Sequence, residues 1–527
     1  MFTALTRGLG AVGDLAGSIF GSRGPAVESP QITNIQTVGE RDTSGSENYG
    51  ANMLQANPLT AFGPQIAQGI ARNLPSIGRA LGIGGGAVIG SQFIGGNGEI
   101  CESPMQKPYN VNKMTGCITI TRKQQMALKD ALKFTDKVFA ISQANKIKNS
   151  DTELPLYGVP LAHKELFQRF IKNGKAWPNE GGSKSRQNVK SHQTAKVISL
   201  LDEAGSIDCG RLVSVEYAFG VTGHNDYAGT PKNPWNKNYV CGGSSSGSAS
   251  IVAAGIIPVA LGSDTGGSVR LPASACGLFG IKPTQGLISR DGVFPLSISL
   301  DSVGPLSRTV YDAATILQIL AVHDDNDHLS VNVKVPNYIS EMKRGIKGIK
   351  IGLPKNYFLE GSDEGVSLET INTFSICEKL GAICSDIKIP DIETANDLNM
   401  LLISTEAALS HKKVALNKHK DFNQQTLMRI LSGVFTNSEE YEKLKKYRIC
   451  FIKNIISKVF DEVDLFIAPV WPCYIPTIKE SDLGANKEAA SLVRRIGHNT
   501  RPINYLGPVS YTHLRAHETL RYLVCRL

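Results

Sequence analysis

The sequence lacks the cysteine patterns that mark metal sites and redox centres. Its ten cysteines are scattered over 527 residues, and no two of them form a C-x-x-C pair or another metal-ligand spacing. Free thiols in a reducing compartment are the simplest interpretation. We therefore expect a cytoplasmic protein without a bound metal.

Targeting and membrane-spanning signals are also absent. Near the N-terminus one arginine is followed by Asp14 and many glycines, which makes a poor signal peptide. The most apolar segment, residues 81–96, is too short and too rich in glycine for a membrane span. The sequence thus establishes no membrane partner.

Charge of one sign is in modest excess only. The chain has 56 basic and 47 acidic residues, a net charge of +9. Its basic runs, such as EMKRGIKGIK and EKLKKYR, are mixed with glutamate and apolar residues, as on solvated helix faces and strand ends. No patch with interleaved aromatics is present, so we expect no nucleic-acid partner.

Three segments differ in composition. Residues 1–125 are rich in glycine, alanine and serine, which predicts a weakly ordered segment, although a glycine-zipper helix is the alternative. Residues 126–508 alternate helical and strand patterns, which predicts an α/β sheet covered on both faces. Residues 509–527 show neither clear period nor turn punctuation. They are interpreted as a non-native tail, with a short basic tail as the alternative.

The alternation is clearest in three places. A helical pattern ends at Gly205 and is followed by a short strand. Residues 348–354 and 381–389 are predicted strands that flank a helix. Thr436 and Glu439 have the spacing of a capping box that opens a long helix.

Three glycine-, serine- and lysine-bearing stretches could carry chemistry. They are GVPLAHKELF with Lys164, CGGSSSGSAS with Ser244 and Ser245, and GSDTGGSVR with Ser268. Taken singly each is weak, because a flexible loop, an anion-binding turn or a lysine that reaches solvent would explain it. A nucleotide-binding P-loop is excluded, since no Gly-Lys-Ser/Thr follows the glycines.

Taken together, they favour a serine nucleophile. Glycines allow positive φ and a close approach of substrate to the main chain, so N–H groups ahead of Ser268 could face a developing oxyanion. A serine hydroxyl needs a base. No histidine lies in the glycine-rich loops, and His163 is only adjacent to Lys164. A buried, neutral Lys164 is the other option, because burial lowers the pKa of a lysine.

Residues 241–284 resemble the amidase signature family, and the similarity extends from about Phe134 to Gly507. The resemblance implies a large mixed β-sheet covered by helices on both faces. It also implies a Ser–cis-Ser–Lys triad. By position, Ser268 matches the acylated nucleophile, Ser244 the bridging serine that follows a cis peptide, and Lys164 the general base.

The resemblance implies further site residues. The main-chain N–H groups that match the oxyanion hole belong to Thr265, Gly266, Gly267 and Ser268. Ser245 resembles a supporting serine. Asp264 and Arg270 resemble braces behind the site, although a purely structural ion pair fits them equally well.

The implied reaction is hydrolysis of a small-molecule amide through a serine acyl-enzyme, without a cofactor. Substrate choice would reside in residues 400–422 and the helices that follow, whose mixed character indicates neither a purely aliphatic tunnel nor a strongly charged pocket. A homodimer is left open.

Two departures from the family pattern leave alternatives. Glu165 stands where the family usually has aspartate, and after Gly507 the usual continuation is missing, which predicts a C-terminally incomplete sheet. One alternative is the A subunit of a tRNA-dependent glutamine amidotransferase, although GGSSSGSAS and AHKELF differ from that subunit's usual GGSSGGSAA and KDN. The other is a truncated, inactive amidase-like protein.

Overall fold

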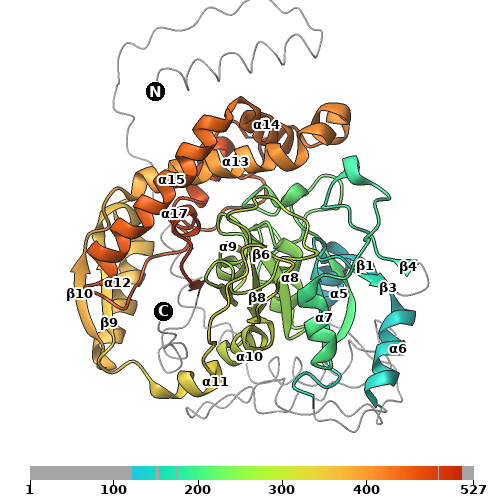
Figure 1. Ribbon diagram of the computed structural model, residues 1–527, viewed down its shortest axis with the longest axis horizontal. Coiled ribbons are helices and arrows are strands. Elements are labelled where there is room, and N and C mark those ends of the chain that lie inside the picture. Colours follow the sequence, from blue (N-terminus) through green and yellow to red (C-terminus); the bar gives the residue numbers. More distant parts are fainter. Residues whose placement is uncertain (1–121, 149–153, 172–174, 485, 513–527) are drawn as a thin grey trace, which may run out of the picture.

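A computed structural model describes residues 122–148, 154–171, 175–484 and 486–512. Helices and strands alternate through these ranges, which confirms the predicted α/β class (Figure 1). The predictions for residues 1–121, and for residues 513–527 of the tail, lie outside the described residues.

The strands pair in four groups. A three-stranded mixed sheet has the order β1-β5-β2, a four-stranded antiparallel sheet the order β12-β7-β8-β6, and a three-stranded parallel sheet the order β10-β9-β11, while β3 and β4 form a hairpin. The bounds are β1 Leu132–Thr135, β2 Pro160–Lys164, β3 Phe170–Ile171, β4 Lys175–Ala176, β5 Ile207–Leu212, β6 Val259–Asp264, β7 Phe279–Lys282, β8 Ser302–Ser307, β9 Lys350–Pro354, β10 Ile383–Ile387, β11 Leu465–Phe466 and β12 Ser510–Thr512.

The helices surround these sheets. In Figure 1, α13, α14 and α15 lie together along one side of the molecule, and α12 lies beside β9 and β10 at its edge. The bounds are α5 Arg122–Ala131, α6 Lys137–Lys148, α7 Lys196–Glu203, α8 Ser246–Ala253, α9 Arg270–Ala275, α10 Val310–Leu320, α11 Tyr338–Glu341, α12 Glu364–Lys379, α13 Ile392–Asn417, α14 Gln424–Ser432, α15 Ser438–Ile455, α16 Ala489–Ile496 and α17 Arg501–Leu506.

Strand β6 shows why both sheet faces are covered. Side chains alternate between the faces of a strand. Val259 and Leu261 pack into one apolar cluster with α7 and α10, whereas Ala260 packs into another with α5, α8 and α9. The predicted covering by helices on both faces is thereby confirmed, and the carboxyl end of β6 is held between two cores.

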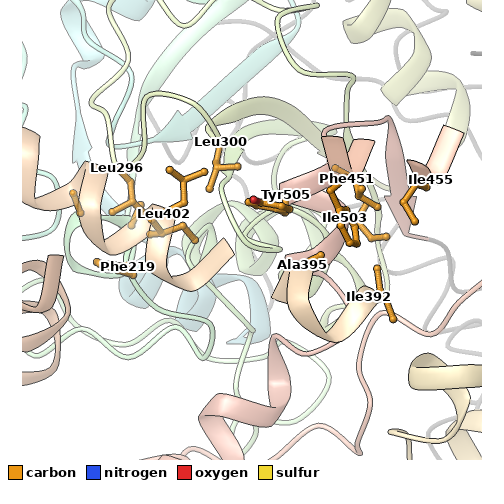
Figure 2. Close-up of a cluster of buried hydrophobic side chains, with 14 of the residues drawn as sticks. Phe219, Leu296, Leu300, Ile392, Ala395, Leu402, Phe451, Ile455, Ile503 and Tyr505 are labelled. Carbon is orange, nitrogen blue, oxygen red and sulfur yellow. The ribbon is translucent and has the colours of Figure 1, made fainter. Parts of the chain in front are cut away.

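A third apolar cluster joins α13 to the C-terminal segment. Figure 2 shows Ala395 and Leu402 of α13 in the same cluster as Ile503 and Tyr505 of α17. Since α17 follows α13 by more than 80 residues in the chain, this packing is long-range. The C-terminal helix α17 is therefore held against α13 by apolar packing.

The local predictions are largely confirmed. Gly205 has φ of 90° and follows Ala204, the C-cap of α7, and β9, α12 and β10 form the predicted strand–helix–strand. The capping box is displaced by one residue. Asn437 caps α15 together with Glu440, and the Thr436 hydroxyl instead accepts a hydrogen bond from the Thr405 hydroxyl at 2.9 Å. Asparagine is the stronger N-cap, which explains the correction.

Candidate active site

The predicted triad residues lie where strands end and helices begin. Lys164 is the last residue of β2, and Asp264 is the last residue of β6. β2 and β6 are neighbours, since the Leu261 N–H donates to His163 Nδ1 at 3.3 Å. The loop 265–269 joins β6 to α9, and Ser244 lies just before α8, so these segments meet at one point.

Lys164 is completely buried and hydrogen-bonded to two hydroxyls. Its Nζ lies 2.7 Å from Ser244 Oγ and 2.9 Å from Ser263 Oγ. Burial lowers the pKa of Lys164 from 10.5 to about 7, against the opposing effect of Asp301 and Asp264. Within the described ranges no carboxylate forms an ion pair with it. A large share of this lysine is therefore neutral near pH 7.

Ser244 and Ser245 are fixed by main-chain contacts. The Gly243–Ser244 peptide bond is cis. The Ser244 carbonyl accepts from the Val215 N–H at 3.1 Å, and the Ser245 N–H donates to the Ser268 carbonyl at 3.2 Å. The Ser245 hydroxyl contacts the backbone of Ser263 at 3.3 Å. The serine-rich loop is thus tied to both β6 and the loop of Ser268.

Asp264 organises the loop that carries Ser268. Its carboxylate accepts the N–H groups of Gly267 and Val269 at 2.9 and 3.0 Å and pairs with the Arg270 guanidinium at 3.0 Å. Burial alone would raise the pKa of Asp264, but Arg270, Asn504 and the backbone donors outweigh it and hold the pKa below its ordinary value. The carboxylate stays ionised and acts as the hub of the loop.

The Ser268 loop leaves several N–H groups unused. The Gly267 N–H is taken by Asp264, whereas those of Thr265, Gly266 and Ser268 have no acceptor within the part of the chain that the structure describes. Gly267 has φ of 124°, and a Cβ there would lie 2.3 Å from Thr500 Oγ1. The loop therefore requires glycine at 267.

The Ser268 hydroxyl stands apart from the lysine cluster. It forms no hydrogen bond among the described residues, and its residue is 6% exposed. Lys164, Ser244 and Ser263 are brought together directly, while Ser268 is joined to them only through the backbone contact of Ser245. The Ser268 hydroxyl is therefore available for a partner from outside the described residues.

Helix α17 supplies contacts that the sequence motifs did not single out. Thr500 Oγ1, directly before α17, donates to the Gly266 carbonyl at 2.7 Å. Asn504 Nδ2 donates to Asp264 Oδ1 at 2.8 Å, and Asn504 Oδ1 accepts from Arg270. Asn504 lies inside the RPINYLG segment of the resemblance, which was the available signal, although that segment had carried no assigned role.

Two buried carboxyls flank Lys164. Asp301 accepts from the Thr265 hydroxyl at 2.5 Å and from the Leu296 N–H at 2.8 Å. Glu165 accepts from the Ser214 N–H at 3.0 Å. Burial raises the pKa of both carboxyl groups. Asp301 was also missed from the sequence, although it lies in the SLDSVG segment.

His163 is not part of the site. Its ring packs edge-on against Phe167, with centroids 6.2 Å apart, and its Nδ1 accepts a backbone hydrogen bond from Leu261. Burial lowers the pKa of His163 to about 3, so the ring is neutral. The histidine beside Lys164 is thus a residue of the core.

A pocket of about 230 Å³ lies beside Ser263. Its wall includes Ser263, Asp301, Arg290 and Asp327, but neither Ser244 nor Ser268. It therefore reaches Ser263, the second hydroxyl partner of the lysine, but not Ser268, and we assign no substrate to it.

Metal and membrane features were searched over the described residues. Among them, no group of three or more His, Cys, Asp or Glu side chains could hold a metal ion. In the same part of the chain, no helix combines the length and the apolar character needed to cross a bilayer.

A buried lysine that hydrogen-bonds to a serine, with unused backbone donors beside a second serine, belongs to hydrolases that use a serine nucleophile without histidine. A comparison with known protein families identifies which class of hydrolase this is. The amidase family model matches residues 121–518, and the chain belongs to the amidase family. It is thereby placed among enzymes that cleave amide C–N bonds.

Individual relatives agree with this placement. The chain is 36% identical over 353 residues to the A subunit of the glutamyl-tRNA(Gln) amidotransferase of Geobacillus kaustophilus, covering 62% of this chain and 71% of the relative. It is 32% identical over 419 residues to the corresponding protein of Chromohalobacter salexigens, covering 75% and 82%. A solved amidase structure superposes with a TM-score of 0.62 and 27% identity, covering 74% and 86%.

Proposed function

We propose that the chain hydrolyses a small-molecule amide through an acyl-enzyme on Ser268. Neutral Lys164 takes the proton of Ser244 as Ser244 takes that of Ser268. The Ser268 oxygen then forms a bond to the amide carbonyl carbon, and the carbonyl π electrons move to its oxygen. The resulting oxyanion faces the N–H groups of the loop.

The donors proposed for that oxyanion are the N–H groups of Thr265, Gly266 and Ser268. The Gly267 N–H donates to Asp264, so it contributes by holding the loop. The C–N bond breaks as Ser244 returns a proton to the nitrogen, and ammonia or an amine leaves. Water then attacks the ester with proton transfer along the same path, releasing the acid and restoring Ser268.

The observation that carries this proposal is the 2.7 Å hydrogen bond from a completely buried Lys164 to Ser244. A lysine placed only for packing would reach solvent with its ammonium group, because burial of the charge costs several kcal/mol. Here it ends on two hydroxyls beside the Ser268 loop.

The test uses a fluorophosphonate, which phosphonylates an activated serine, and ammonia release from simple amides. We expect the wild-type chain to be labelled on Ser268 and Ser268→Ala to lose both labelling and turnover. Ser274→Ala, on the neighbouring helix α9, is the matched control and should keep both. Labelling that persists in Ser268→Ala would show that another residue is the nucleophile.

A second candidate function is favoured by the names of the curated relatives. Those proteins are the A subunits of glutamyl-tRNA(Gln) amidotransferases, so this chain could supply ammonia from glutamine to a partner enzyme. Purified chain without partner proteins distinguishes the two. Steady release of ammonia from simple amides supports the freestanding enzyme, and activity only with added partner proteins supports the second candidate.

The remaining expectations are part of the same proposal. Residues 126–508 form the catalytic domain, which acts without nucleic acid. A cytoplasmic location is supported by seven free cysteines among the described residues, five of which are buried. Gel filtration and binding of labelled RNA would test the assembly state and the absence of a nucleic-acid partner.

A further inference from the structure

Helix α13 carries a buried polar side chain without a partner among the described residues. Asn399 is completely buried, and neither its Nδ2 nor its Oδ1 forms a hydrogen bond there. It lies between Ala395 and Leu402, which Figure 2 shows within the apolar cluster. Burying a carboxamide without partners costs more than burying an apolar group of the same size.

Three other buried polar side chains of α13 have hydrogen-bond partners. Glu406 accepts from the Tyr441 hydroxyl at 2.8 Å, Thr405 contacts the Thr436 hydroxyl at 2.9 Å, and His411 Nε2 lies 2.8 Å from the Pro295 carbonyl. Asn399 differs from these three residues, and it differs from Asn396 as well, because both of its side-chain polar atoms lack a partner among the described residues whereas Asn396 lacks one only at Oδ1. Such exceptions concentrate at sites that meet a ligand.

Asn399 faces the loop of the nucleophile. A carbon placed as Cβ on Gly266 would lie 3.8 Å from Asn399 Oδ1 and 3.6 Å from both Ile403 Cδ1 and Arg501 Cγ. These are ordinary van der Waals distances, so the space before Gly266 accepts at least one carbon atom. The side chains around that space are one carboxamide, one aliphatic group and one arginine.

Arg501 adds positive charge to this corner. It is 7% exposed, it donates to the Arg494 carbonyl at 2.9 Å, and it forms no ion pair within the described part of the chain. A buried guanidinium without a carboxylate favours a group with partial or full negative charge nearby. The positive charge of Arg501 would therefore attract the same kind of group to which the Asn399 carboxamide could donate a hydrogen bond.

We propose that Asn399 is a specificity-determining residue, whose carboxamide hydrogen-bonds to a carbonyl or carboxylate on the acyl part of the substrate. The inference rests on the proposed function and names its substrate class, amides whose acyl group carries a second polar carbonyl function. Contact requires the side chains that cover Asn399 to move, since Asn399 is completely buried in the structure.

Three amides of similar size provide the test: butyramide, succinamide and succinamate. The wild type should show a kcat/KM at least 10-fold higher for succinamide and succinamate than for butyramide. In Asn399→Leu the ratio of succinamate to butyramide should fall about 10- to 100-fold, the loss of one hydrogen bond to a neutral or charged group. Asn417→Leu, an exposed asparagine at the end of α13, is the control and should keep the ratio.

A stability measurement separates binding from a structural role. Because leucine removes an unpaired polar group, the urea midpoint of Asn399→Leu should equal or exceed that of the wild type. If the leucine variant does not fold, Asn399→Asp replaces it. There the carboxylate should reduce succinamate turnover at least 10-fold more than succinamide turnover.

Failure of this inference differs from failure of the proposed function. A wild type that is labelled by fluorophosphonate but hydrolyses the three amides equally overturns the role of Asn399 alone. Equal losses on all three amides in Asn399→Leu also overturn it, since they indicate an effect on the reacting centre. A folded wild type without labelling overturns the proposed function itself.

Discussion

Replacing Lys164 by methionine removes the amine while keeping a chain of similar length. Among the described residues, the native Nζ hydrogen-bonds only to the hydroxyls of Ser244 and Ser263, at 2.7 and 2.9 Å. Loss of a general base typically lowers the rate by about 10²- to 10⁴-fold. We expect kcat/KM for a simple amide to fall by that amount in Lys164→Met.

The same substitution should change how stability depends on pH. The pKa of Lys164 is 10.5 in an open environment and about 7 in the fold, because burial disfavours the charged form. Between these values the unfolded chain binds more protons, so the free energy of unfolding rises with pH. At 1.36 kcal/mol for each pKa unit, the full interval corresponds to roughly 4–5 kcal/mol. The methionine variant lacks this contribution.

Urea unfolding at pH 7, 8 and 9 measures the effect, and kcat/KM over pH 5.5–9 measures the chemistry. Lys164→Met should be more stable than wild type at pH 7, and its advantage should shrink as the pH rises. Wild-type kcat/KM should rise with pH through about 7 as the amine becomes neutral. Lys446→Met, an exposed lysine of α15, is the control. A pH-independent stability difference, together with no rate change near pH 7, would refute a buried neutral lysine.

Two further predictions concern the nucleophile loop. Gly267→Ala should lose about 2–5 kcal/mol of stability by urea unfolding, because φ is 124° and the new Cβ would lie 2.3 Å from Thr500 Oγ1. Gly266→Ala is the control and should lose less than about 1 kcal/mol. Equal losses in the two variants would contradict this packing. Asp264→Asn leaves the Arg270 guanidinium buried without its carboxylate and should lose about 3–5 kcal/mol in the same assay. A loss below about 1 kcal/mol would mean that the pair is not coupled to folding.

The sequence predicted the fold class and the three segments of the site because their signals are local. Glycines stand before Ser244 and Ser268, and Lys164 follows an apolar run that becomes the buried strand β2. Lys164 thus ends a buried strand, whereas Ser244 and Ser268 stand in buried loops just before α8 and α9. The capping residue of α15 was misplaced by one position, since Thr436 and Asn437 both suit an N-cap and asparagine is the stronger of the two.

The contacts between distant segments were not predictable in the same way. Asn504 reaches Asp264 across 240 positions, and Asp301 reaches Thr265 across 36. Asn399 gives no sequence signal, because a single asparagine on a helical apolar face resembles any buried polar residue. What distinguishes it is that both of its side-chain polar atoms lack a partner among the described residues, which depends on the fold.

The bracing of the Ser268 loop by α17 has a consequence for synthesis on the ribosome. A nascent chain that has emerged to residue 310 already contains Lys164, Ser244 and Ser268, yet it lacks the hydrogen bonds from Thr500 to Gly266 and from Asn504 to Asp264. Roughly 190 further residues must be translated before these bonds can form, about 10–40 s at ordinary elongation rates. The loop of Ser268 therefore receives these two braces only after most of the chain has been made.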